Sequence, residues 1–175
     1  MWALVVLGLV AVVVVAGLPF LVFPAHDEPG QVDVVLVLGG PTDARVDLAM
    51  QMVDDGLTEN VLISLDPEQS ENYRAAADAC ASRPEVVQCL KPDPFTTRGE
   101  VMWLSRESEA NGWESAAVIT FGPHISRARL IVNQCFGGDV LMLNSEEKVS
   151  LPYYAYMYAY QSAATVKALI QGRCE

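Results

Sequence analysis

The feature that most constrains the fold is a strand–turn–helix pattern in residues 32–47. Residues 34–38 (VVLVL) are an unbroken, largely β-branched apolar run that is too short for a buried helix, so they predict a fully buried strand. The sequence GGP at residues 39–41 ends this strand. Thr42 or Asp43 then caps a helix whose apolar positions follow a 3.6-residue period. The pattern is the first unit of a parallel α/β sheet.

The same alternation of strand and helix runs through the rest of the chain. Five strands with short connections predict a mainly parallel sheet with helices on both faces. We therefore expect one α/β domain over residues 32–175, a three-layer sandwich with the sheet between two layers of helices. The later strands are expected at 60–65, 85–90, 115–121 and 139–143, and the helices that follow at 66–80, 98–109, 124–135 and 152–171.

The first 23 residues contain no charged side chain. The apolar stretch from Trp2 to Phe23 reaches roughly 33 Å as a helix, which matches the hydrocarbon core of a bilayer. It predicts a transmembrane anchor at 1–23, followed by a polar linker at 24–31. A cleaved signal peptide is the alternative, although the basic segment that such peptides carry is missing. Because the linker enters the first strand at its amino end, the anchor is expected away from the carboxyl edge of the sheet.

The rest of the chain is acidic and contains four cysteines. Its 11 Lys and Arg residues stand against 22 Asp and Glu residues, a net charge of −11 that argues against nonspecific binding to nucleic acid or to an anionic membrane surface. The cysteines form no CxxC pair and have no His-rich partner set, which favours disulfides over zinc and an extracytoplasmic domain. The motifs GxGxxG, P-loop and GxSxG are absent, so dehydrogenase, NTPase and serine-hydrolase functions lose their usual support.

Helix direction suggests which cysteines pair. The last two helices end on the side of the sheet opposite the carboxyl ends of the strands, and Cys135 and Cys174 both lie there. A disulfide between them is expected. Cys80 and Cys89 would join a helix to a strand one layer away, so a second disulfide or two buried thiols both stay open.

The carboxyl ends of parallel strands meet at one edge of the sheet, where ligands bind. Polar residues and arginines follow several of the predicted strands, and free helix N–H groups lie there too. Arginine grips phosphate or carboxylate with two parallel hydrogen bonds, so an anionic ligand is expected. The four arginines expected at this edge are Arg45, Arg98, Arg127 and Arg129, and the predicted ligand-binding residues are Gly39, Gly40, Arg45, Thr97, Arg98, Glu100, Thr120 and Arg127.

His124 is the candidate for proton transfer, because its ordinary pKa lies near neutrality. It could instead cap its own helix. Arg127 could bind a surface carboxylate rather than ligand, and Arg45 could form a structural ion pair with Glu100. The aspartates near this edge have no spacing that demands a metal, so no metal site is predicted, and whether the domain uses a cofactor stays open.

Three segments resemble the YdcF/SanA/ElyC-like family of bacterial envelope proteins. They are VITFGPHISRA at 118–128, which contains His-x-x-Arg-Ala, the sequence VLGG at 37–40 with Arg45 downstream, and TTRGE at 96–100. The chain departs from the family after its second strand, where Ser64 precedes Leu-Asp-Pro rather than two glycines. The resemblance implies a Rossmann-like fold, membrane anchoring and a role in envelope maintenance or peptidoglycan assembly. One member is described as binding a nucleotide-like methyl donor.

These observations predict a membrane-anchored, extracytoplasmic domain that acts on or binds an anionic, phosphate-bearing intermediate of the cell wall. The alternative is a non-catalytic module that binds a nucleotide-like ligand or serves as a scaffold, and whether the domain is an enzyme stays open. In the last helix, Tyr153, Tyr156 and Tyr160 share one face. They are expected to pack or to lie half-exposed, and a patch for a partner or for the bilayer interface is the alternative.

Overall fold

The structure, a computed structural model, describes residues 22–40 and 42–174, together with residues 2, 5, 8, 12, 15, 17, 19 and 20. The predicted membrane anchor at 1–23 therefore lies largely outside the described residues. Among the residues that are described, no helix is long and apolar enough to cross a membrane.

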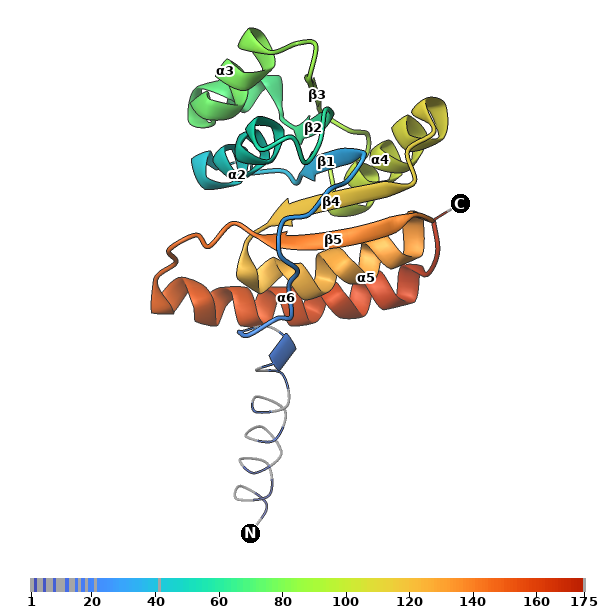
Figure 1. The fold of residues 1–175 in the computed structure, drawn as a ribbon. Coiled ribbons are helices and arrows are strands. Elements are labelled where there is room, and N and C mark those ends of the chain that lie inside the picture. The colour runs from blue at the N-terminus through green and yellow to red at the C-terminus, as the bar shows by residue number, and fades with distance from the viewer. Residues whose placement is uncertain are drawn as a thin grey trace.

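Five parallel strands form a single sheet at the centre of the domain (Figure 1). The strands are β1 (Val34–Val37), β2 (Val61–Ser64), β3 (Val87–Leu90), β4 (Ser115–Thr120) and β5 (Asp139–Asn144). Their order across the sheet is β3-β2-β1-β4-β5. The central strand β1 pairs on both sides, with Leu36 opposite Leu62 of β2 and Val118 of β4. The predicted α/β fold with a five-stranded parallel sheet is confirmed.

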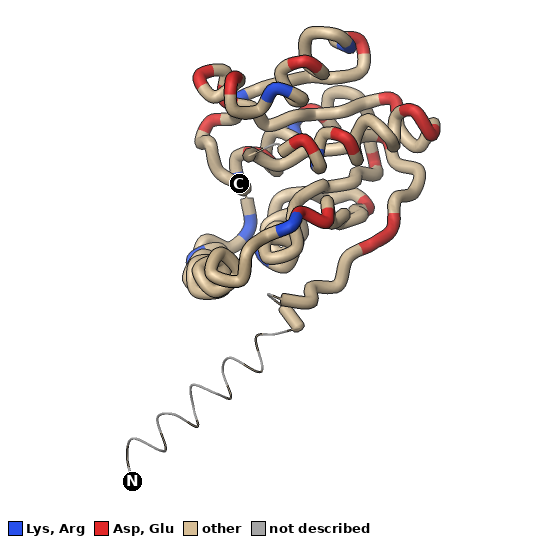
Figure 2. Tube along the Cα trace, turned by 90° about the vertical axis from the view of Figure 1, so that its left-hand side faces the viewer, with Lys and Arg blue, Asp and Glu red and all other residues tan. Residues whose placement is uncertain are grey.

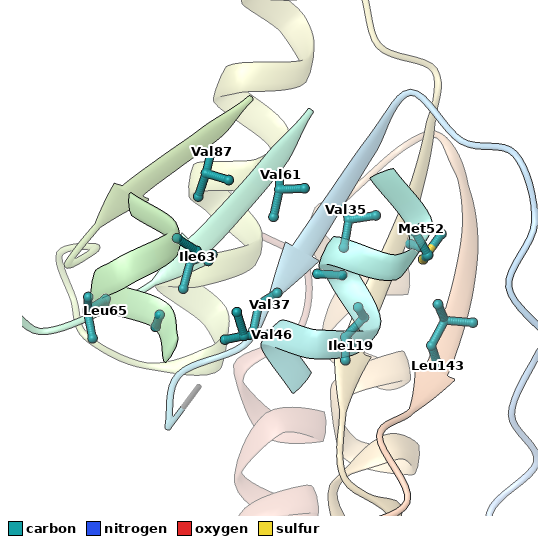
Figure 3. Packing of buried hydrophobic residues seen from close by; sticks show 14 of the residues in the cluster. Val35, Val37, Val46, Met52, Val61, Ile63, Leu65, Val87, Ile119 and Leu143 are labelled. Carbon is teal, nitrogen blue, oxygen red and sulfur yellow. The ribbon is translucent and has the colours of Figure 1, made fainter. Parts of the chain in front are cut away.

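Helices cover both faces of this sheet (Figure 1). The helices are α2 (Asp43–Asp54), α3 (Arg74–Ser82), α4 (Thr97–Asn111), α5 (Ile125–Cys135) and α6 (Leu151–Gln171). Val35 and Val37 of β1 point into a core shared with α2 and α3, which Figure 3 shows. Val34 and Leu36 point into a second core shared with α4 and α5. Burial on both sides explains why this strand is apolar at every position.

Two helix starts differ from those expected. The segment predicted as one helix over 66–80 divides into the short 3-10 helix η1 (Pro67–Asn72) and α3, because Tyr73 between them has a non-helical backbone. Helix α4 begins at Thr97 rather than after it, and the hydroxyl of Thr96 accepts the capping hydrogen bond from the Gly99 amide. Thr97 is thereby free to turn its side chain toward the carboxyl edge of the sheet.

Two disulfides connect the four cysteines. Cys135 at the end of α5 bonds to Cys174 beyond α6, as the direction of the helices predicts. Cys80 of α3 bonds to Cys89 of the edge strand β3, with 6.0 Å between their Cα atoms. This second bridge forms because the end of α3 lies against β3 at the edge of the sheet. It settles the open alternative of two buried thiols in favour of a disulfide.

The linker is not the free tether that its polar sequence suggests. The Asp27 amide donates to the Met142 carbonyl, and the Asp27 carboxylate accepts from the Met142 amide and from Arg129. Residues 24–31 thus lie along β5 and α5 before they reach β1 (Figure 1). At the far end of this path the Phe20 carbonyl accepts a hydrogen bond from Ser126 of α5.

This path corrects the expected position of the anchor. The linker does enter β1 at its amino end, but it first passes beside the sheet. Phe20, near the end of the apolar segment, therefore contacts the first turn of α5, close to the carboxyl edge of the sheet rather than on the opposite side.

Candidate functional site

A cavity of about 490 Å³ opens at the carboxyl edge of the sheet, beyond the ends of β1 and β4. Its walls come from the β1–α2 turn, the start of α4, the short 3-10 helix η2 (Gly122–His124) with the first turn of α5, and one side of α6. All strands are parallel, so their carboxyl ends bring these segments together. Among the predicted site residues, those that line it are Gly39, Gly40, Arg45, Thr97, Glu100, His124 and Arg127.

Glycine is required at both positions of the β1–α2 turn. Gly40 has a φ of +72°, a left-handed conformation that other residues rarely adopt. A β-carbon at Gly39 would lie 2.5 Å from the Glu100 Oε1 atom, which already accepts the Gly39 amide hydrogen at 2.6 Å. The turn therefore brings backbone and carboxyl into direct contact beneath the pocket.

Glu100 is a buried carboxyl group, 4% exposed. Burial raises its pKa, and the hydrogen bond from Gly39 and the positive charges of Arg45 and Arg127 oppose that effect only in part. A carboxyl group with a raised pKa holds its proton more readily.

Arg45 is held by several contacts within the protein. Its Nε donates to the Glu147 carboxylate at 2.6 Å, and its Nη1 donates to the Gly39 carbonyl at 3.0 Å. Its guanidinium also lies 5.1 Å from the centre of the Phe121 ring. The structural ion pair considered for Arg45 exists, but its partner is Glu147 and not Glu100. The charge of Arg45 is therefore already balanced.

His124 is held as a neutral ring by three neighbours. Arg127 Nη2 donates to Nε2 at 2.7 Å, so Nε2 carries no proton. The proton is therefore on Nδ1, which donates to the Thr120 hydroxyl at 2.9 Å. The Thr97 hydroxyl lies 3.4 Å from Nε2. Burial, and then the positive charges of Arg127 and Arg45, lower the pKa of His124 well below its ordinary value.

Arg127 has only neutral partners. Its Nε donates to the Gln161 side-chain oxygen at 2.6 Å, and its guanidinium lies 5.9 Å from the centre of the Tyr160 ring. None of the ion pairs between described residues involves it. Its charge interacts with the buried Glu100 carboxyl group, but its hydrogen bonds go to neutral groups only, so this half-buried guanidinium can still bind an anion in the cavity.

The other predicted residues lie outside the cavity. Arg98 donates to the Gly172 and Arg173 carbonyls and holds the end of the chain. Arg129 pairs with Asp27 of the linker. Thr120 is fully buried behind His124. The four arginines lie in the first turns of their helices, but they do not converge on this cavity, because Arg98 and Arg129 bind distant backbone and the linker.

Two residues that matter at the site were not predicted. Glu147 lies in the loop after β5, and the rule that locates sites after parallel strands could have identified it. Gln161 is 1% exposed on a helix that is otherwise mostly apolar on its inner side. A polar amide buried on such a helix requires a hydrogen-bond partner, which here is Arg127.

The tyrosines of α6 form one wall of the cavity. The rings of Tyr153, Tyr156 and Tyr160 follow one another at 6.2 and 6.1 Å, and Phe121 continues the row at 6.4 Å. The face that these three tyrosines share is thus partly packed against neighbouring rings and partly exposed to solvent. Beyond Tyr160 and Arg127 a second cavity of about 460 Å³ continues along α6 and is lined by Lys167 and Arg98.

The cavity does not offer a metal site in the described part of the chain, where no group of three or more His, Cys, Asp or Glu residues is placed to hold an ion. Its donors are instead suited to an anion. Comparison with known proteins adds no relative, since no family model, curated protein or solved structure matches this chain.

Proposed function

We propose that this domain binds a phosphate-bearing anion in the cavity at the carboxyl edge of its sheet. The observation that supports this most strongly is the state of Arg127, a half-buried guanidinium with neutral partners only. Arg45 is already paired with Glu147, whereas no carboxylate of the described residues forms an ion pair with Arg127. An anion would complete the hydrogen bonds of Arg127 and balance its charge.

His124 would become available as a proton acceptor in the same step. While the cavity is empty of anion, Nε2 accepts from Arg127 at 2.7 Å. If the guanidinium turns toward a bound phosphate, Nε2 is released next to the ligand. A neutral imidazole there could take a proton from an attacking water or hydroxyl group. The buried Thr120 hydroxyl would keep the ring oriented through Nδ1.

We further propose that the domain is tethered to a membrane and acts in the cell envelope outside the cytoplasm. The uncharged stretch from Trp2 to Phe23 has the length of a membrane span. The two disulfides fit an oxidising compartment. The resemblance of the segments around Gly39, Thr97 and His124 to the YdcF/SanA/ElyC-like family supports a role in peptidoglycan biogenesis or envelope integrity.

A non-catalytic binding module is the second candidate. One observation favours it: the hydrogen bond from Arg127 occupies Nε2, the only ring nitrogen of His124 that could act as a base. If Arg127 keeps this bond when ligand is present, the site binds without turnover.

A thermal-shift screen of the full chain with inorganic phosphate, pyrophosphate and nucleoside diphosphates tests the proposal. We expect pyrophosphate or a nucleoside diphosphate to raise the melting temperature, since ligand that binds only the folded state stabilises it. Release of inorganic phosphate from a stabilising compound would then distinguish an enzyme from a binding module. If no phosphate compound stabilises the chain, the proposal is wrong.

A further inference from the structure

Helix α6 presents an exposed apolar face along its length. Tyr156 is 61% exposed and Ile170 is 81% exposed, and Val166 between them is 57% exposed. Since successive helical residues are 100° apart, Tyr156, Val166, Ile170 and the two alanines between Tyr156 and Val166 on this face fall within an arc of about 80°. Lys167, at the border of the arc, is the single charged residue of α6. The α6 outer face comprises Tyr156, Ala159, Ala163, Val166 and Ile170.

The described part of the chain does not cover this face. Helix α6 packs on α5 through its opposite side, where Met157, Gln161 and Ala168 are buried. In Figure 1 α6 is the outermost element on its side of the domain. Contiguous apolar surface of this kind marks an interaction site on a protein or a membrane.

The N-terminal apolar segment meets the domain beside this same face. Ser126 of α5 donates to the Phe20 carbonyl, and the Tyr158 ring of α6 lies so close to Gly17 that a β-carbon there would overlap its hydroxyl group. Tyr158 lies on the flank of α6 opposite to the tyrosines that line the cavity. The outer face therefore lies between the apolar segment on one side and the mouth of the cavity on the other.

The charge distribution agrees with a membrane on this side. Figure 2 shows most acidic positions in the upper part of the domain in that view, and fewer at its lower end, where the described chain enters it. An acidic surface would be repelled by an anionic bilayer, so its distance from α6 favours close approach of this helix. Tyrosine is enriched where one end of a side chain is apolar and the other is wet, and lysine extends its charge toward water from such positions.

We infer that the α6 outer face lies against the surface of the lipid bilayer and fixes the orientation of the domain. The inference rests on the membrane tether proposed above. An apolar segment that enters the bilayer next to α6 leaves this helix as the nearest part of the domain to the lipid. The mouth of the cavity, bounded by Tyr153, Tyr156 and Tyr160, then opens at the level of the membrane surface.

Photo-crosslinking in vesicles tests this orientation. The full chain is reconstituted in vesicles of equal parts phosphatidylethanolamine and phosphatidylglycerol, with benzoylphenylalanine replacing Tyr156, Ile170 or Leu90 in separate variants. Leu90 is the matched control, because it is an exposed apolar residue (41%) on β3, at the other edge of the sheet from β5. We expect several-fold more lipid adduct at Tyr156 and Ile170 than at Leu90.

Each other result overturns the inference. Equal lipid labelling at all three positions would mean that the domain has no preferred orientation, and crosslinks between two chains at Tyr156 and Ile170 would assign the face to a second copy. Absence of adducts would place the face away from lipid. Flotation of the same vesicles tests the tether separately: a chain that floats without these lipid adducts contradicts the orientation alone, and a chain that does not float contradicts the tether.

Discussion

Arg127 Nη2 donates a hydrogen bond to His124 Nε2 over 2.7 Å. This contact determines the tautomer of the ring, and it occupies both groups while they line the cavity. The guanidinium stays charged at neutral pH, so Nε2 must accept and the proton must remain on Nδ1. An anion that attracts Arg127 would change the hydrogen bonding of both residues together.

Stability should fall with acidification because of His124. The pKa of the folded-state ring is lowered, so the unfolded chain takes up a proton below about pH 6.5 that the folded chain does not. The free energy of unfolding should therefore decrease toward pH 5 by up to about 1.4 kcal/mol per pH unit. Urea unfolding of the wild type and of His124→Gln measures this effect, and the slope of the variant should be shallower. Equal slopes would contradict a buried neutral ring.

Removing the charge of Arg127 should abolish most anion binding. The Arg127→Gln variant loses a charge-assisted contact worth about 1.5–3 kcal/mol, which corresponds to roughly 10- to 100-fold weaker binding of pyrophosphate. Arg106→Gln is the matched control, because Arg106 is exposed on α4 outside the cavity. Isothermal titration of both variants measures the difference. Equal weakening in the two variants would indicate a general charge effect.

Removing the charge of Glu147 should have opposite effects on stability and on binding. Glu147→Gln weakens the buried contact with Arg45, with an expected loss of about 1–3 kcal/mol in the free energy of unfolding. Because a negative charge next to the cavity is gone, pyrophosphate should bind more tightly than to the wild type. Glu109→Gln, an exposed carboxylate on α4, is the control and should change neither quantity. Weaker binding in Glu147→Gln would contradict an anion site beside Arg45.

Glu100 should oppose folding as pH rises. Its folded-state pKa is raised, so the folded chain holds a proton above about pH 4.5 that the unfolded chain releases, and stability decreases through this range. Glu100→Gln keeps the oxygen that accepts from Gly39 and removes the charge. The variant should gain stability relative to the wild type between pH 4.5 and neutrality. Denaturant unfolding of the wild type and the variant at several pH values measures this gain. A difference in unfolding free energy that does not change with pH would contradict a raised pKa of Glu100.

The disulfides should contribute unequally to stability. In the chain-entropy model, the bridge between Cys135 and Cys174 closes a loop with a sequence separation of 39 and contributes about 4 kcal/mol. The bridge between Cys80 and Cys89 closes a separation of 9 and contributes about 3 kcal/mol. Paired Cys→Ser variants, unfolded in urea, should show this order. A larger loss from the shorter loop would contradict it.

The fold was largely predictable because its signals are local. The apolar run at 34–38 can be buried on both sides only in the middle of a sheet, and the alternation of strand and helix implies parallel pairing. The order of the strands is not encoded in this way. The division of the helix at Tyr73 was also not predicted, because no proline or glycine at this position marks the non-helical backbone that Tyr73 adopts.

The site was predictable in its location but not in its pairings. The rule for parallel strands places Gly39, His124 and Arg127 at one edge, and the cavity joins them. Which arginine faces the cavity depends on partners distant in sequence, such as Gly172 for Arg98 and Asp27 for Arg129. No local pattern reveals such contacts. The balance of charge in the cavity thus emerged only from the structure.

The most direct measurement of the central claim is the ¹⁵N chemical shift of His124 Nε2 during titration with inorganic pyrophosphate. In the absence of ligand, this nitrogen should show the shift of an unprotonated ring nitrogen that accepts a hydrogen bond. As pyrophosphate binds and attracts Arg127, the shift should move along a saturable curve, and the movement should be absent in Arg127→Gln. An Nε2 shift that stays constant while pyrophosphate saturates the protein would show that the anion binds elsewhere and would contradict the proposed site.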